Sequence, residues 1–365
     1  MKTKSYPNQD GTRQLQGASH ASPPGLLGIL GAMLLAATLP VMAADDLAPL
    51  SDEFDDATTL SQWSRVYQAE GWGFDQLEHW DINESNAGRM TMVPHSSSWF
   101  EEWRGVHAYK SVTGDFVVTT DVQPTSRSGS GAPNALFSLS GIMVRSPRTM
   151  TSGALDWTPN GQNYIFLSTG AANTPGTYQF EVKDNRNSVS QLHITPGAPS
   201  AKIQVARIGA VFLVLRRIEG GEWEIHRRYV REDMPTSLHV GLTCYTDWNT
   251  CSQNGYAFHN LNLLTNGLPL PGGGVLATAN PDLIARFDYV RFQRPLVPAS
   301  LSGRNFASPA EVSDAEILAF LGSNSDQPHT PASDAPPIIT QQPQAQTVTE
   351  LETAQFTVAA SGAPP

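Results

Sequence analysis

Short runs of alternating apolar and polar residues, separated by turn-forming residues, fill most of this chain from Leu50 to about Pro295. In GDFVVTTDVQ, for example, Phe116, Val118 and Val122 would share one face of an extended strand. Alternate residues of a strand point to the same side, so a period of two predicts half-buried strands. Helical periodicity is absent from this stretch. We therefore expect an all-β sandwich.

Glycines mark the tight turns expected between the later strands. Gly209 joins the runs AKIQVARI and AVFLVLRRI, and Gly220-Gly221 precedes Trp223. Glycine reaches positive φ without steric cost, which a tight hairpin needs. The closing strands are expected within Leu213–Tyr229, Leu238–Cys244 and Ala285–Phe292.

The start of the chain differs from the rest. It has basic residues at Lys2, Lys4 and Arg13, an apolar run over Gly25–Leu39, and small residues up to Ala43. This pattern predicts a secretory signal peptide spanning residues 1–43. A membrane anchor is the alternative, but the apolar run has about 15 residues, fewer than the roughly 20 needed to cross a bilayer. We expect a soluble protein that is secreted or displayed at the cell surface.

The charge balance argues against several partners and cofactors. The formal net charge is −11, and removal of residues 1–43 makes it more negative. An acidic chain without a basic cluster repels phosphate backbones, so nucleic acid is not an expected partner. The glycine-rich segments lack the lysine and helix of a phosphate-binding loop. No organic cofactor is expected.

The two cysteines, Cys244 and Cys251, lie in CYTDWNTC. In a secreted protein a disulfide between them is the expected state. A metal or redox pair is the alternative, but the spacing is not that of the usual two-residue motif. A bridge here would place Asp247 and Trp248 at the tip of a small loop.

The composition changes after Pro295. Ser308 as cap, Pro309 at the first position and Gly322 at the end predict a short helix, followed by a linker rich in Pro, Ser and Asp. The tail, residues 338–365, contains Pro343, Val348, Phe356 and Val358, followed by Ala-Ser-Gly-x-Pro-Pro at Ala360–Pro365. In these residues it resembles the opening strands of a bacterial immunoglobulin-like domain. These divisions give a sandwich over residues 44–296 and a helix with linker over 297–337. The tail is too short for its own core, so we expect further C-terminal domains in a longer polypeptide.

Four local motifs point to a family for the sandwich. They are SDEFD at Ser51–Asp55 with Trp63, GIMVR at Gly141–Arg145, the Arg-Arg to Gly-Gly-x-Trp block ending at Trp223, and AxFDYV at Ala285–Val290. In this order they resemble the concanavalin A-like lectin/glucanase superfamily, and within it laminin-G-like bacterial modules of unassigned function. The resemblance implies a two-sheet antiparallel jelly roll whose first and last strands are neighbours.

The same resemblance implies a metal site. Neighbouring first and last strands would bring Asp55 close to Asp288, where many relatives hold a structural calcium ion. Carboxylate oxygens suit that ion. The alternative is that the acidic residues around Asp55 only form a solvated strand start.

Catalytic carboxylates do not have the expected spacing. The run from Glu78 to Glu84 places its two ends roughly 20 Å apart on an extended strand, whereas glycosidases need about 5 to 9.5 Å. The neighbours Glu101 and Glu102 would point to opposite faces. A glycoside hydrolase therefore remains an alternative only if carboxylates of different strands converge. A polysaccharide lyase is a further alternative. Its catalytic candidates, by residue type alone, are His107, Tyr109 and Arg145.

Tryptophans give the strongest indication of function. Trp63, Trp80 and Trp223 are expected in the core, whereas others lie in polar, loop-like contexts. Sugar C–H faces stack on exposed indole rings. By the family resemblance, Arg145 points to the concave face. The candidate ligand-binding residues are Trp99, Trp103, Arg145, Trp157 and Trp248.

Together these features predict a secreted carbohydrate-binding or adhesion module that binds a polysaccharide or another glycan. We expect a binding protein rather than an enzyme. A structural spacer with no ligand is the remaining alternative.

Overall fold

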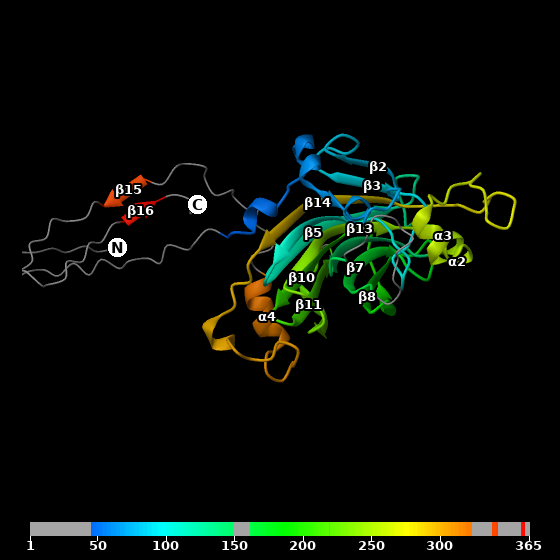
Figure 1. Ribbon diagram of the computed structural model, residues 1–365. Helices are drawn as coiled ribbons and strands as arrows, with labels where there is room; N and C mark the ends of the chain where they lie inside the picture. The colour runs from blue at the N-terminus through cyan, green and yellow to red at the C-terminus, as the bar shows by residue number, and fades with distance from the viewer. Residues whose placement is uncertain (1–44, 149–160, 219, 323–337, 342–358, 362–365) are drawn as a thin grey trace, which may run out of the picture. The chain divides into compact units, whose positions relative to one another are not determined.

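The computed structural model describes residues 45–148, 161–218, 220–322, 338–341 and 359–361. The predicted signal peptide, Trp157, the linker and most of the immunoglobulin-like tail lie outside the described residues. Figure 1 shows two layered β-sheets that make up the main body.

All strand pairs in the two sheets are antiparallel, and each sheet has seven strands. The first sheet has the order β12 (Glu224–Val230), β11 (Val211–Ile218), β10 (Ala201–Ile208), β5 (Phe116–Thr125), β14 (Ile284–Gln293), β3 (Met90–Pro94), β2 (Leu77–Ile82). The second has the order β1 (Ser64–Arg65), β4 (Ala108–Thr113), β13 (Ser237–Tyr245), β6 (Ser138–Arg145), β7 (Tyr164–Ala171), β8 (Gln179–Arg186), β9 (Val189–Pro196). The predicted fold class, an all-β two-sheet sandwich, is confirmed.

The main core lies between the sheets and follows the alternation seen in the sequence. Phe116, Val118 and Val122 of β5 belong to it, while Val117 points to the other side of the first sheet. Gly209 has φ of +60° at the β10–β11 hairpin, as its place in the sequence predicts. The backbones of Asp52 and Val290 exchange two hydrogen bonds of 2.8 Å. The first and last segments of the sandwich are therefore neighbours, as expected.

Short helices interrupt the strands, contrary to the expected absence of helical segments before Pro295. They are α1 (Val66–Ala69), α2 (Trp248–Gln253) and α3 (Gly255–Leu261), with 3₁₀ turns η1 (Ala48–Leu50) and η2 (Ala57–Gln62). Each has seven residues or fewer, which is too short to show a clear 3.6-residue period. Within the described part of the chain, no helix is long and apolar enough to cross a membrane.

The C-terminal helix α4 (Asp314–Leu321) packs on the outer face of the first sheet. Its start differs from the prediction: Ser313, not Ser308, caps it, and Glu316 completes a capping box, which satisfies two orphan backbone donors. Gly322 ends the helix as predicted. The second core, between helix and sheet, contains Val117, Ala206, Leu213, Leu215, Trp223, Leu301 (in η4, Ala299–Leu301), Phe306, Val312, Ile317, Phe320 and Leu321.

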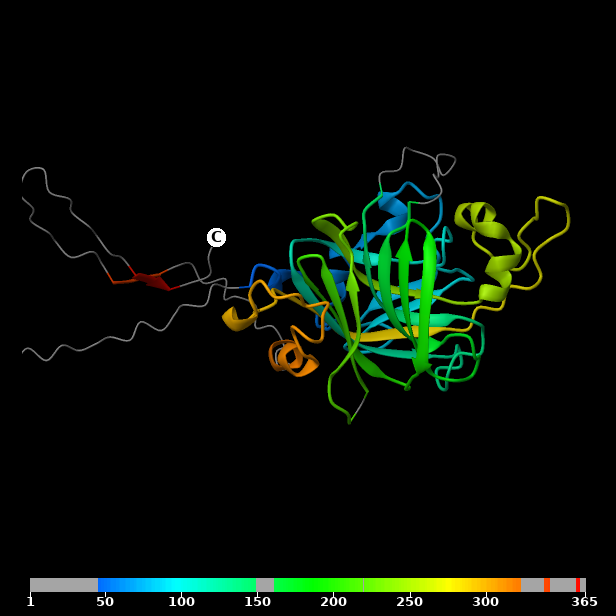
Figure 2. The ribbon, with the colours of Figure 1, turned by 90° about the horizontal axis from the view of Figure 1, so that it is seen from below.

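In Figures 1 and 2, α4 and the α2–α3 pair lie at opposite sides of the sandwich. The α2–α3 pair thus lies away from the face that α4 covers. The strands β15 (Ile338–Gln341) and β16 (Ala359–Ser361) pair antiparallel. The immunoglobulin-like nature of this tail stays a prediction.

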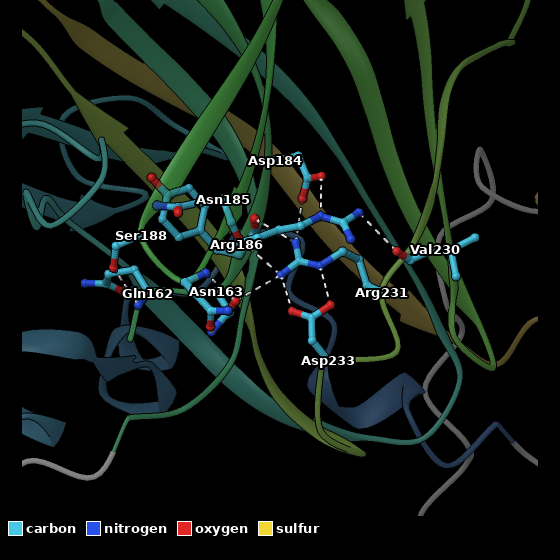
Figure 3. A network of polar contacts seen from close by, with 11 residues as sticks. Gln162, Asn163, Asp184, Asn185, Arg186, Ser188, Val230, Arg231 and Asp233 are labelled. Atoms are coloured by element: carbon cyan, nitrogen blue, oxygen red, sulfur yellow. Dashed lines mark hydrogen bonds and ion pairs between the residues drawn. The ribbon is translucent and has the colours of Figure 1, made fainter. Parts of the chain in front are cut away.

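A buried arginine ties the two sheets together at the end of β12 (Figure 3). Arg231 has no exposed surface and lies 2.6 Å from Oδ1 of Asp184 on β8. It also donates two hydrogen bonds to Asp233, at 2.8 and 2.7 Å, and one each to the carbonyls of Tyr164 and Asn185. This network joins the segment leaving the first sheet to two strands of the second.

Candidate functional site

The outer face of the second sheet carries charged side chains that are buried. On β8, Phe180 and Val182 point into the core, so Glu181 and Lys183 point to the opposite side. Both are nearly inaccessible, with exposed fractions of 0% and 1%. Burying charges is costly unless they are paired, so this face must supply partners.

The loop between β3 and β4, residues 95–107, covers this outer face of the second sheet. Trp99, in that loop, has no exposed surface, donates a hydrogen bond of 2.7 Å from Nε1 to the Val106 carbonyl, and packs edge-on against Tyr164 at 5.7 Å between ring centroids. The expectation that Trp99 lies exposed for stacking on a ligand is therefore wrong, because its own loop folds the ring onto the sheet.

Arg145 lies on the same outer face, beneath Trp99. Its guanidinium carbon lies 5.3 Å from the Trp99 ring, and Nη2 lies 2.5 Å from Oε1 of Glu70. Nε donates to Oε1 of Gln162 at 3.1 Å. Since Arg145 and Glu70 are both almost fully buried, Arg145 forms a structural ion pair here rather than an open contact point.

Lys183 holds a fixed position at the edge of this covered region. Its Nζ donates to the Trp99 carbonyl and, at 2.7 Å, to Oη of Tyr245, and lies 3.2 Å from Oε1 of Glu181. Burial lowers the pKa of Lys183, while Glu181 opposes that shift. Burial raises the pKa of Tyr245 well above its usual value. The ammonium and the phenol thus form a rigid polar pair.

A small apolar pocket opens above this pair. Its volume is about 180 Å³. It is lined by Ser98, Phe100, Phe137, Lys183, Leu192, Tyr245 and Trp248. Aromatic and aliphatic walls with a few fixed polar groups are the usual composition of a small-ligand site.

Trp248 reaches the pocket because of how α2 begins. Asp247, with φ of +69°, caps the helix and accepts a hydrogen bond of 2.6 Å from Ser96. The amide of Trp248 itself donates to the Leu136 carbonyl at 2.9 Å. These contacts fix the first turn of α2 against the β3–β4 and β5–β6 loops.

Trp103 and Trp248 form one half-buried aromatic cluster beside the pocket. Their ring centroids are 5.2 Å apart, Phe100 lies 5.1 Å from Trp248, and Tyr256 of α3 lies 5.8 Å from Trp103. All pairs meet edge-on, a favoured geometry for aromatic rings. The structure therefore brings together two of the four tryptophans that the sequence singled out.

The sequence analysis missed Glu181, Lys183 and Tyr245. For Glu181 and Lys183 the signal was available in YQFEVKDN, where they alternate with the apolar Phe180 and Val182, whereas Tyr245 ends the apolar run LHVGLTCY and has no such signal. On an ordinary surface strand the same alternation means only a solvated face, so the pattern did not distinguish the two cases.

The carboxylates named as possible catalytic groups do not pair with one another. Glu78 on β2 of the first sheet contacts Arg127 at 2.8 Å, and Glu84 and Glu101 are exposed. Glu102 is buried beside Arg148 at 3.5 Å, and Ser188 donates a hydrogen bond to it. On the outer face of the second sheet, Glu70, Glu102 and Glu181 each lie beside a cation. Such pairing favours a structural role for all three.

The residues named for a lyase do lie together. The rings of His107 and Tyr109 are 5.3 Å apart, Tyr109 stacks on His239 at 3.8 Å, and His239 lies opposite Arg145 in the sheet. Burial, with repulsion from His239 and Arg145, holds the pKa of His107 well below its usual value. Yet His107 and Arg145 have no exposed surface, and a general base must reach its substrate. In this arrangement neither His107 nor Arg145 is accessible to a substrate.

The proposed calcium ligands do not form a cluster. Asp288 lies 3.8 Å from Arg89, and the backbone carbonyl of exposed Asp55 accepts a hydrogen bond of 2.6 Å from Asn83. Among the described residues, no group of three or more His, Cys, Asp or Glu side chains could hold a metal ion. A structural calcium ion held by Asp55 and Asp288 stays an untested prediction.

The expected disulfide is wrong in this structure, where both cysteines are free thiols. Cys244 points into the main core, with Sγ 4.0 Å from Sδ of Met92. Cys251 lies on α2 and packs with Leu264 and Leu276 in a separate cluster. The helix, which the sequence spacing did not predict, turns Cys251 away from the core that holds Cys244.

A thiol assay distinguishes the two states. We expect both thiols of the chain to react with a chromogenic disulfide reagent in denaturant without reductant. The native chain should react slowly, since burial raises the pKa of both Cys244 and Cys251 and the thiolate is the reactive form. If the denatured, unreduced chain has no titratable thiol, Cys244 and Cys251 form the predicted disulfide.

Comparison with known proteins finds only distant structural likeness. No family model and no curated protein matches this sequence. A functionally unknown protein from Saccharomyces cerevisiae aligns over 65% of this chain and 98% of its own, with 13% identity and a TM-score of 0.41. The GH43 protein BlXynB from Bacillus licheniformis aligns over 70% of this chain and 41% of its own, with 14% identity and a TM-score of 0.42. A basic winged bean lectin, solved with Tn-antigen, aligns over 67% and 98%, with 12% identity and a TM-score of 0.38.

Likeness at this level assigns neither ligand nor activity to this chain. The sandwich is established by its own strand pairing. The laminin-G-like assignment stays a prediction.

Proposed function

We propose that this protein is a carbohydrate-binding module whose glycan site is the pocket between Phe100 and Trp248. The observation that carries the proposal is the combination of a half-buried aromatic cluster with a small pocket whose walls include Phe100, Leu192 and Trp248. Apolar and aromatic walls suit the C–H face of a sugar ring.

The proposed contacts follow from the chemistry of the lining. The C–H face of a sugar ring would stack on Trp248 or Phe100. Its hydroxyls would point out of the pocket, because Lys183 and Tyr245 are buried and already hydrogen-bonded within the protein. A pocket of about 180 Å³ lies below the roughly 300–1,000 Å³ of drug-sized ligand sites. It suits a single ring or the end of a chain better than a long internal segment.

The ion pairs near the pocket favour binding without catalysis. Glu70, Glu102 and Glu181, which are buried on this face, each lie beside a cation, and a glycosidase needs two carboxyl groups about 5 to 9.5 Å apart across the scissile bond. We further propose secretion, directed by residues 1–43, so that the module acts on extracellular glycans.

A glycan-array screen of the purified chain tests the proposal. We expect binding to a restricted set of glycans that share a terminal or branch-end ring. Release of reducing sugar or of an unsaturated product from a bound glycan would contradict the non-catalytic form. Binding to none of the arrayed glycans would favour the structural-spacer alternative.

A further inference from the structure

The outer face of the first sheet changes character along its strands. Near α4 the outward residues are apolar, for example Val117 on β5 and Leu215 on β11. Further along the same strands, beyond the helix, the outward positions are charged: Asp121 on β5, Lys202 on β10 and Arg217 on β11. One half of this face is therefore covered by the C-terminal segment, and the other half is polar and uncovered by it.

The charged half is hollowed into a groove of about 650 Å³. Its lining residues are Arg89, Asp121, Gln123, Ser200, Ala201, Lys202, Arg217, Gly220 and Gly221. A volume of this size falls within the range of small-ligand sites. The groove lies on the sheet opposite to the one that carries the aromatic pocket.

Among the lining residues cations outnumber anions, with Arg89, Lys202 and Arg217 against Asp121, although the chain as a whole has a net charge of −11. Lys202 stands between Asp121 and Arg217 in one cross-strand row. Arg286 on β14 lies opposite Gln123 of β5 and close to Arg89.

Arg89 and Arg286, at one end of the groove, contact mostly uncharged groups. Arg89 contacts Oε1 of Gln123 at 3.3 Å and lies 3.8 Å from Asp288. Arg286 donates to Thr125 and Asn86, which are neutral. Burial and the nearby Arg89 lower the pKa of Arg286, which agrees with a local excess of positive charge.

We propose that this groove binds an acidic oligosaccharide through its carboxylate groups, independently of the aromatic pocket. Arginine binds carboxylates through paired donors, and cationic clefts concentrate anionic ligands. The lining has a single apolar side chain, Ala201, so it lacks the apolar centre of a protein interface. A long polyanion such as nucleic acid would be repelled by the rest of this acidic chain.

Titration calorimetry of the full chain with trigalacturonate, and with its fully methyl-esterified form as the matched neutral ligand, tests this proposal. We expect the acid to bind at least about tenfold more tightly than the ester, and to weaken severalfold between roughly 0.01 M and 0.15 M salt as screening increases. Equal affinity for acid and ester would overturn the proposal.

Substitutions locate the site. Lys202→Glu and Arg217→Glu should each weaken binding of the acid about tenfold or more, whereas Arg304→Glu, an exposed site on the C-terminal segment, should leave it unchanged. Circular dichroism checks folding, and Lys202→Gln, which should cause a smaller loss, serves if a reversal variant does not fold. Unchanged binding by a folded Lys202→Glu variant would also overturn the proposal.

Trp248→Ala distinguishes this proposal from the proposed function. Binding of trigalacturonate should survive that substitution. If it is lost in a folded variant, the acid occupies the aromatic pocket and the groove proposal fails.

Discussion

Replacing Trp248 with alanine is expected to weaken binding of the recognised glycan about 30-fold, which corresponds to roughly 2 kcal/mol. Trp248 is the pocket residue with the largest ring, and it lies in edge-on contact with both Phe100 and Trp103. Its removal takes away the stacking surface and opens the pocket to water. Isothermal titration of the best glycan from the array measures the loss.

Two further variants separate stacking from folding. Trp248→Phe keeps an aromatic ring and should retain most of the affinity. Phe74→Ala removes an aromatic side chain that is 45% exposed and does not line the pocket, so its affinity should equal that of the unchanged chain. If the Trp248→Ala and Phe74→Ala variants bind the glycan equally tightly, the glycan binds outside this pocket.

Replacing Arg231 with methionine is expected to lower the free energy of unfolding by about 3–5 kcal/mol. The substitution removes the bidentate contact with Asp233 and leaves the Asp184 carboxylate, 4% exposed, without its buried partner. Asp184 then keeps only the half-exposed Arg186 as its cation, and a buried carboxylate that loses its buried partner destabilises a protein strongly. Urea unfolding monitored by tryptophan fluorescence measures the change.

Arg186→Met is the matched control, because Arg186 contacts the same carboxylate, with Nε 2.9 Å from Oδ2 of Asp184. Its side chain is 47% exposed, so the ion pair is screened by solvent and its loss should cost no more than about 1 kcal/mol. Similar small losses for Arg231→Met and Arg186→Met would show that the network in Figure 3 does not tie the sheets together.

The sandwich could be predicted from the sequence because its signal is local. Alternation in β5 separates Phe116 and Val118, which face the main core, from Val117, which faces α4. The sequence does not reveal that Val117 also finds a partner, since that contact joins residues far apart in the chain. For the same reason the helix was expected in a linker, whereas it packs on the first sheet.

The candidate site could be predicted only in part. Trp103 and Trp248 lie in polar sequence contexts and do form one cluster, yet Trp99, in a similar context, is buried. The difference is the hydrogen bond from Trp99 to Val106 and the polar partners beneath the ring. Local composition carries no information about either contact.

A crystal structure of the chain with its best array glycan tests the central claim most directly. We expect a sugar ring in the pocket, stacked on Trp248 or Phe100. A neutral glycan bound outside this pocket, or held between two carboxylates within about 10 Å of each other across a glycosidic bond, would contradict it.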